Sequence, residues 1–404
     1  MGIGAQLMPK CVSSITGGIV LFESKTRDFQ GPRAYGEGHW DYLDRSGRIE
    51  AARVREFLDR WFDRFPATDR DELGSRLRCG DAASFESASF ELILFAVLTT
   101  RGYAVSTHPT LPAGNPKHPD FLATAGDESF YVEAVLASEY RDDEISARRR
   151  ADAVLRAVDG INSPDFRLFV IAQGNPDTPP RGRALANQLQ TWLDSLDSDT
   201  VARAAEADGH EAIPKFPWAH DGWDVTFEAI PKGVEHRGEN GRAIGSLAGE
   251  ARLVNVREPI RNAIRAKGAK YGQLDRPLLI AVNVDGLSLD RIDEMEALFG
   301  QEEYVFLPDN PTTPPQMRRT PNGAWVAGDG PTYTRVGGAW IFDGLGPWNV
   351  ARQRGCLYFN PWAQMQPPES LSAFTHARVA DQRMEWIEGL VFGEILGLDA
   401  AWPE

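Results

Sequence analysis

Residues 118–135, HPDFLATAGDESFYVEAV, form the segment that most constrains how this chain folds. Its two halves, HPDFLAT and SFYVEAV, are rich in β-branched and aromatic residues, and the AGDE between them has turn chemistry, so the segment predicts two strands joined by a tight turn. With AGDE as the loop, Thr124 faces Ser129, and counting back along both strands places Asp120 opposite Glu133. Cross-strand partners share a face of the sheet, so these carboxylates are expected about 5 Å apart at Cβ. That spacing suits one divalent cation held by oxygen ligands.

The segments around this strand pair predict the order helix, strand, strand, strand, helix. A helix starting at Asp81 or Ser84 has one apolar stripe, with Glu91 at its edge, and Tyr103–Thr107 predicts the first strand. The acids at 142–144 begin a second helix, where they favour the positive end of its dipole. The apolar run Phe166–Ala172 that follows predicts a strand covered on both faces, with a right-handed crossover and a parallel neighbour.

This arrangement resembles the PD-(D/E)XK nuclease superfamily, which has the restriction-endonuclease-like fold. The resemblance rests on Pro119-Asp120, twelve intervening residues and Glu133-Ala134-Val135, all behind the helix that carries Glu91, and it covers roughly residues 81–175. The motif is short, so its value comes from the order of elements on which it falls. In the family a lysine stands two residues after the glutamate, where this chain has Val135. Either a basic residue from elsewhere takes that role, or the site is not catalytic.

The resemblance implies a metal site and its ligands. Asp120 and Glu133, supported by Glu91 and the backbone carbonyl of Ala134, would hold Mg²⁺ or Mn²⁺, which activates water and screens the scissile phosphate. Alternatively, Glu91 is only the polar border of an amphipathic helix. The resemblance also implies a nucleic-acid partner, DNA before RNA, and a homodimer, for which the apolar C-terminal helix expected around 386–395 offers an interface.

A helix after residue 255 supplies candidates for the missing lysine. Ile260 and Ile264 lie on its apolar stripe, and Lys267 falls on the same stripe with Lys270 beside it. A lysine on a core-facing line either meets an acid or reaches solvent near the helix end. We expect Lys267 or Lys270 to neutralise charge on the phosphate or to orient the attacking water.

Arginines on two predicted helices are candidates for phosphate contacts. The alternative for each is an ordinary solvated helix face. The candidates are Arg148 and Arg149 on the helix after residue 142, and Arg257, Arg261 and Arg265 at four-residue intervals on the helix after residue 255.

Pattern and length together predict an α/β protein with a mixed central sheet flanked by helices, elaborated at both ends. Residues 1–80 are expected to form an N-terminal extension with a strand at 18–22 and a helix at 47–65. Residues 81–300 would form the restriction-endonuclease-like core, with an insertion around 175–250. Residues 301–404 would add tryptophan-rich strands and a final helix that pack on this core. Pro277–Val284 predicts a second doubly buried strand.

Composition is that of a globular protein, with 404 residues and 42% hydrophobic residues. Three widely separated cysteines and no evident run of about 20 apolar residues predict a cytoplasmic protein without a membrane span. The net charge of −15 requires that any nucleic-acid contact use a local cationic surface.

Other catalytic motifs are missing from the sequence. It contains no P-loop, no G-x-S-x-G, no H-E-x-x-H and no dinucleotide-binding glycine pattern. Three hypotheses therefore stand: a Mg²⁺-dependent endonuclease, an inactive module of the same fold that binds nucleic acid or a protein partner, and a small-molecule hydrolase or ligand-binding protein of unrelated fold.

Overall fold

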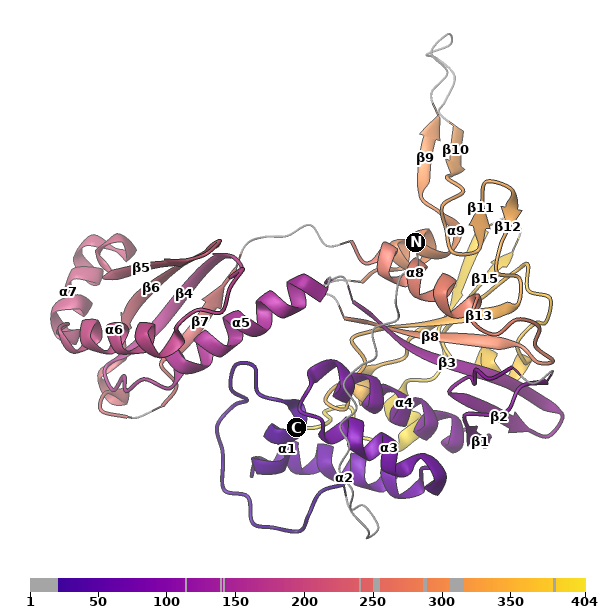
Figure 1. The fold of residues 1–404 in the computed structure, drawn as a ribbon, viewed down its shortest axis with the longest axis horizontal. Helices are drawn as coiled ribbons and strands as arrows, with labels where there is room; N and C mark the ends of the chain where they lie inside the picture. The colour runs from indigo at the N-terminus through magenta and orange to yellow at the C-terminus, as the bar shows by residue number, and fades with distance from the viewer. Residues whose placement is uncertain are drawn as a thin grey trace. The chain divides into compact units, whose positions relative to one another are not determined.

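The computed structural model describes residues 21–112, 115–138, 140, 142–239, 241–249, 255–285, 289–305, 316–380 and 383–404. The chain divides into two compact units, whose elements Figure 1 labels. The first unit contains residues 1–31, 38–139 and 254–404, and the second contains residues 32–37 and 140–253. Most of the strand expected at 18–22 lies outside the described residues.

The first unit contains most of the helices and strands. Its helices are α1 (His39–Arg45), α2 (Ile49–Arg64), α3 (Ala67–Arg78), α4 (Ala82–Thr100), α8 (Arg257–Gly268), α9 (Arg291–Phe299) and α10 (Phe392–Leu396). Its main strands are β1 (Ala104–Thr107), β2 (Phe121–Ala125), β3 (Glu128–Ser138), β8 (Leu278–Asp285), β13 (Val336–Asp343), β14 (Cys356–Phe359), β15 (His376–Ala380) and β16 (Arg383–Ile387). Two small hairpins add β9 (Glu302–Val305) with β10 (Gln316–Arg319), and β11 (Val326–Ala327) with β12 (Gly330–Pro331).

The eight main strands form one mixed sheet in the order β1-β2-β3-β8-β13-β14-β15-β16. Strand β8 pairs in parallel with both β3 and β13, whereas β1 with β2, β2 with β3 and β13 with β14 are antiparallel. The strand predicted at 277–284 is therefore the centre of the sheet, and every residue of β8 except Asp285 is buried. The predicted α/β class with a mixed central sheet flanked by helices is confirmed.

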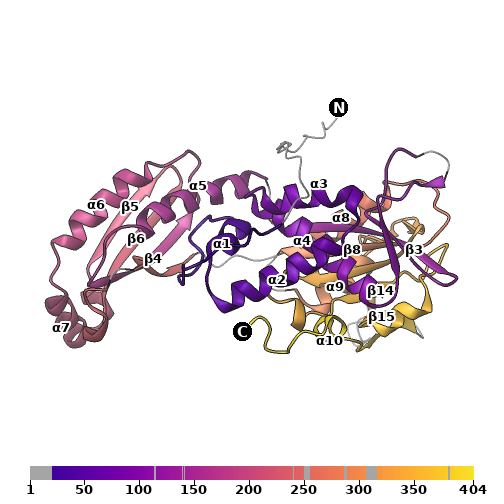
Figure 2. The same ribbon diagram turned by 90° about the horizontal axis from the view of Figure 1, so that it is seen from below.

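Two hydrophobic cores lie on opposite faces of this sheet. One core joins α2, α3 and α4 to side chains such as Val132 and Phe130 of β3, and the other joins α8 and α9 to Ile280 and Val282 of β8. Figures 1 and 2 show the two sets of helices against the sheet. The alternation of side chains along β3 and β8 explains the division, because successive residues point to opposite faces.

Helix α4 is the core helix of the first face. Asp81, one of the two helix starts expected from the sequence, caps it by accepting a hydrogen bond from the backbone N–H of Ser84 at 2.9 Å. The helix is buried almost all round, which explains why its hydrophobic residues do not form a single narrow stripe. By length and composition alone α4 meets the criterion for a membrane span, contrary to the sequence expectation, but 67% of that window is buried, as in the core helix of a soluble protein.

The second unit has its own sheet and core. Its elements are α5 (Asp142–Asp159), β4 (Phe166–Gly174), α6 (Gly182–Asp194), α7 (Ser198–Asp208), β5 (Lys215–His220), β6 (Trp223–Pro231) and β7 (Ile244–Ala248). The sheet order is β5-β6-β4-β7, with β4 antiparallel to β6 and parallel to β7. The helix and strand that were expected to continue the core after Val135 thus belong to this unit, which begins at Tyr140 rather than near residue 175. The parallel neighbour of β3 is β8 instead.

The C-terminal third differs from the sequence expectation in two ways. Strands β13 to β16 are half of the central sheet rather than an addition to it, because β13 pairs directly with β8. The final helix is only α10, and Trp386 and Ile387 lie in strand β16. The backbone N–H of Leu390 donates to the carbonyl of Ala373 at 3.0 Å, so this stretch is held extended and the helix starts later.

Candidate functional site: a buried carboxylate centre

The pairing of β2 with β3 brings Asp120 and Glu133 together. Thr124 pairs with Ser129 and Phe121 with Val132, as the turn predicted, and one further step matches Asp120 with Glu133. The turn itself is shorter than expected, because Ala125 and Glu128 are already paired. Asp120 lies just before β2, and its Oδ2 accepts the backbone N–H of Ala134 at 2.6 Å. The two carboxylates therefore meet where β3 continues beyond its antiparallel partner.

Glu133 is fully buried, and three donors surround its carboxylate. Lys267 Nζ lies 2.5 Å and Lys270 Nζ 2.8 Å from Oε1, while the Tyr271 hydroxyl bonds Oε2 and lies 3.1 Å from the carbonyl of His118. Lys267 is in the last turn of α8, and the other two donors follow its end. A buried carboxylate without a cation is strongly destabilising, so the two ammonium groups make this buried position tolerable.

The lysines reach the face of β3 on which the resemblance to PD-(D/E)XK nucleases predicts a lysine. Glu133 and Val135 are two residues apart on β3, so their side chains point to the same face. Val135 packs in the core that contains Ile260 and Ile264 of α8. The end of α8 therefore brings Lys267 to this face from another part of the chain, and of the two alternatives for this lysine the structure favours contact with an acid.

Glu91 of α4 is held by an arginine that the sequence analysis did not identify. Arg76 of α3 donates to both oxygens of Glu91, at 2.7 and 2.6 Å, and lies 2.8 Å from Glu72. Burial opposes the charge on Arg76, but Glu91 and Glu72 outweigh it and raise the pKa of Arg76 above its usual value. The fork of a guanidinium matches a carboxylate in two places, so Glu91 has a fixed position.

The surroundings of Asp120 disfavour the charged form of its carboxyl group. Burial, and then the carboxylates of Glu133 and Glu91, raise the pKa of Asp120 to about 7, although the Ala134 N–H and the Lys267 ammonium act in the opposite direction. Burial and the charge of Glu133 also raise the pKa of Tyr271 above its usual range, so its hydroxyl stays protonated and donates. A cation placed beside Asp120 would stabilise its charged form and so lower its pKa.

The carboxylate centre offers oxygen atoms as possible ligands for Mg²⁺. Within the described residues, no group of three or more His, Cys, Asp or Glu side chains is arranged to hold a metal ion. Mg²⁺ nevertheless commonly takes only one or two carboxylates, with water and phosphate as its remaining ligands. Asp120 and Glu133 provide two such carboxylates, and burial, followed by the charges of Glu133 and Glu91, raises the pKa of Asp120 to about 7. The chemistry of the donors therefore fits a hard divalent cation.

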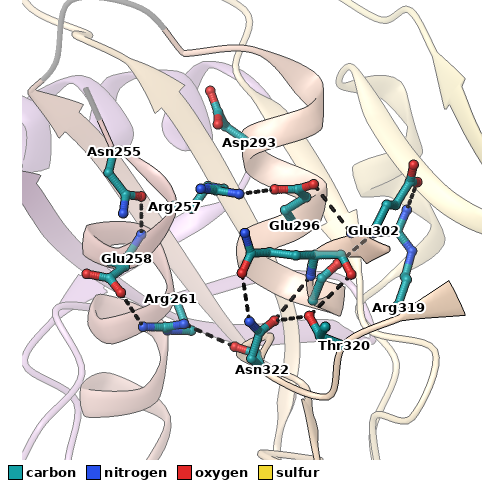
Figure 3. Close-up of polar contacts among 12 residues, drawn as sticks. Asn255, Arg257, Glu258, Arg261, Asp293, Glu296, Glu302, Arg319, Thr320 and Asn322 are labelled. Atoms are coloured by element: carbon teal, nitrogen blue, oxygen red, sulfur yellow. Dashed lines mark hydrogen bonds and ion pairs between the residues drawn. The ribbon is translucent and has the colours of Figure 1, made fainter. Parts of the chain in front are cut away.

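The predicted arginines belong to the second unit or have partners of their own. Arg148 and Arg149 are exposed on α5 in the second unit, and the Arg148 guanidinium lies over the Tyr140 ring at 4.1 Å. Figure 3 shows that Arg257 pairs with Glu296 of α9.

The other two arginines of α8 hold the loop before β11. Arg261 lies 3.3 Å from both Glu258 and the carbonyl of Asn322 (Figure 3), and Arg265 donates to the carbonyl of Gly323 at 2.7 Å. The structure thus gives the arginines of α8 a bracing role between α8, α9 and this loop. Their contact with nucleic acid stays a prediction.

Comparison with known proteins adds no relative to this picture: no family model, no curated protein and no solved structure matches the chain.

Proposed function

We propose that the chain is a divalent-metal-dependent nuclease with a restriction-endonuclease-like core, hydrolysing phosphodiester bonds of DNA or RNA. The observation that carries the proposal is the convergence of Asp120 and Glu133 with two lysines from the end of α8. It combines paired carboxylates with cations on the face of β3 toward which Val135, the residue at the lysine position of the motif, also points.

Each residue of the centre has a role in this proposal. Asp120 and Glu133, with the carbonyl of Ala134, would hold Mg²⁺ or Mn²⁺, and Glu91 would support the site from α4. The bound ion would supply a more acidic water and screen the charge on the scissile phosphate. Lys267 and Lys270 share one oxygen of Glu133, so one ammonium can keep Glu133 charged while the other faces the phosphate.

Asp120 must lose its proton before it can act as a ligand. Because the pKa of Asp120 is about 7, metal binding competes with a proton near neutral pH. Tyr271 and Arg76 orient Glu133 and Glu91 without touching the phosphate, in the way that hydrogen-bond partners commonly fix metal ligands.

The test is a cleavage assay on supercoiled plasmid, single-stranded DNA and RNA, with Mg²⁺ or Mn²⁺ against EDTA. We expect metal-dependent cleavage that falls by at least about 100-fold in Asp120→Ala and in Glu133→Ala. Glu385→Ala removes an exposed carboxylate of β16 and should leave the rate unchanged. Circular dichroism would establish that the variants fold. Cleavage that survives EDTA, or that persists in folded Asp120→Ala, would reject the proposed site.

A second candidate is a module of the same fold that binds nucleic acid or a protein partner without cleaving it. It is favoured by the pairing of Glu133 and Glu91 with cations of the chain itself, and by the net charge of −15. This candidate predicts retention of a nucleic-acid probe with no cleavage in any metal, and retention that Asp120→Ala does not alter.

A further inference from the structure

A cavity of about 200 Å³ opens at the carboxyl ends of three adjacent parallel strands, β3, β8 and β13. Leu136 of β3 and Val284 of β8 line it, together with residues from α4 and from the loop after β13. Ligands of α/β proteins commonly bind outside the carboxyl ends of parallel strands. At roughly 30 Å³ for each water molecule, the cavity has room for several waters or one small ring system.

The walls of this cavity are held in place by hydrogen bonds between side chains and backbone. The side chain of Asn283 accepts the N–H of Leu345 and donates to its carbonyl, both at 2.8 Å. Asn349 makes the corresponding contacts to Gly346 and Gly344, also at 2.8 Å, and the Trp402 indole donates to the carbonyl of Pro347 at 3.0 Å. The loop 344–349 is therefore preorganised, so a ligand would not have to order it.

The lining favours a flat ring and disfavours an anion. Phe85, Leu136 and Trp348 provide apolar and aromatic surface, and the His39 imidazole is already stacked on Phe85 with 5.2 Å between ring centroids. Glu86 contributes a carboxylate whose side chain is 39% exposed and lies 3.5 Å from His39. Among the described residues that line the cavity, none is Lys or Arg. A phosphate in the pocket would meet negative charge without a permanent cation.

We propose that this cavity is a subsite for a purine or pyrimidine base that carries an exocyclic amino group. The ring would lie against Phe85, Leu136 and Trp348, and the amino group would donate to Glu86. The apolar lining favours an uncharged ring over a small ammonium ion, which would lose its hydration there.

Identification of the base as part of a nucleic-acid substrate rests on the proposed function. Helix α4 carries both Glu86 and Glu91, and β3 carries both Leu136 and Glu133, although these two side chains of β3 point to opposite faces of the sheet. The phosphate backbone would stay outside the cavity, where the acidic lining does not repel it.

The test is calorimetric titration of the full chain with nucleosides in EDTA, where no cleavage occurs. We expect adenosine and cytidine to bind at least about 5-fold more tightly than uridine, which lacks the amino group, and more tightly than their 5′-monophosphates. Glu86→Gln should reduce the preference over uridine, and Asp120→Asn should leave nucleoside binding unchanged. Binding and cleavage are read separately, so failure of one proposal is distinguishable from failure of the other.

A matched pair of glycine variants tests the location. Gly346 lines the cavity, and a Cβ added there would have no other atom within 4 Å. The same space is open at Gly328, which lies in the turn between β11 and β12. We expect Gly346→Leu to weaken adenosine binding at least about 10-fold and Gly328→Leu to leave it unchanged. The proposal is overturned if the folded protein binds no nucleoside, if Gly346→Leu binds as well as the parent chain, or if choline or spermidine binds more tightly than adenosine.

Discussion

The first unit contains two clusters with buried carboxyl groups, the carboxylate centre at Asp120 and Glu133 and a second cluster at Glu294. They differ in the side chains around the carboxyl groups. In the carboxylate centre, Asp120 lies among Glu133, Glu91 and Lys267. In the second cluster, Glu294 of α9 accepts the Tyr358 hydroxyl at 2.6 Å, and the Trp386 indole donates to that hydroxyl at 3.2 Å. Each cluster pairs a buried carboxyl with a tyrosine.

Burial is the largest cause of the raised pKa in both clusters. Burial raises the pKa of Glu294 to about 7, against the opposing effects of Tyr358 and Arg291, and the pKa of Asp120 also reaches about 7. Glu294 also has two carboxylates, Asp343 and Asp290, and the Arg291 cation among its electrostatic neighbours. A raised pKa alone therefore does not identify a functional site. Direct contact distinguishes the two clusters: two lysines as well as a tyrosine donate to Glu133 beside Asp120, whereas Glu294 accepts a hydrogen bond from Tyr358.

The largest expected difference between the clusters concerns their cations. Replacing both Lys267 and Lys270 by Met leaves Glu133 buried and uncompensated, so we expect the free energy of unfolding to fall by about 3–5 kcal/mol. Arg291 near Glu294 forms an exposed pair with Glu388, and Arg291→Met should cost less than about 1 kcal/mol. Urea unfolding measures both. Adding Glu133→Gln to the double variant should restore most of the loss, and an unrestored loss would mean that the lysines act through packing alone.

The pH dependence of stability comes next in size. The folded-state pKa values of Asp120 and Glu294 exceed their ordinary values of 3.8 and 4.5, so the folded state retains protons that the unfolded state loses. The contribution of these two groups to the free energy of unfolding is fully present below about pH 4 and is lost as the pH rises to about 7. We expect Asp120→Asn and Glu294→Gln each to raise stability at pH 8 by on the order of 2 kcal/mol and to have little effect at pH 4. Thermal unfolding at the two pH values gives the comparison, and equal effects at both would contradict these pKa values.

The smallest expected effect on stability comes from the two tyrosines. Tyr271→Phe and Tyr358→Phe each remove one buried hydroxyl, and each should cost about 1 kcal/mol in unfolding free energy. Their effects on cleavage should differ, because only Tyr271 orients a proposed metal ligand, and loss of such support commonly costs roughly 10- to 100-fold in activity. Equal cleavage rates for the two variants would remove Tyr271 from the site.

The parts of the centre that the sequence predicted are those set by short-range geometry. The tight turn fixed the register of Thr124 against Ser129 and thereby of Asp120 against Glu133, and helical spacing placed Lys267 on the buried stripe of α8. Arg76 was missed because its contact with Glu91 depends on how α3 packs on α4. The spacing of residues along either helix does not predict this packing. Tyr271 was missed because it follows the helix end, beyond the periodic pattern.

The choice of strand partners was not predictable in the same way. The apolar run in β4 has the composition of a buried strand, but nothing local in it specifies a separate sheet with β6 and β7. The parallel partner of β3 is β8, which comes more than 100 residues later in the sequence. Pairing over such a separation depends on which faces are covered elsewhere in the chain.

Calorimetric titration of the chain with Mn²⁺ and Mg²⁺ at pH 8 tests most directly the central claim that the carboxylate centre binds a divalent metal. The matched variants are Asp120→Asn and Glu294→Gln, two isosteric changes at buried carboxyls whose pKa values are both about 7. The account predicts metal binding by the parent chain and by Glu294→Gln, and at least about 10-fold weaker binding by Asp120→Asn. Binding that is absent from the parent chain, or that Asp120→Asn retains in full, would contradict it.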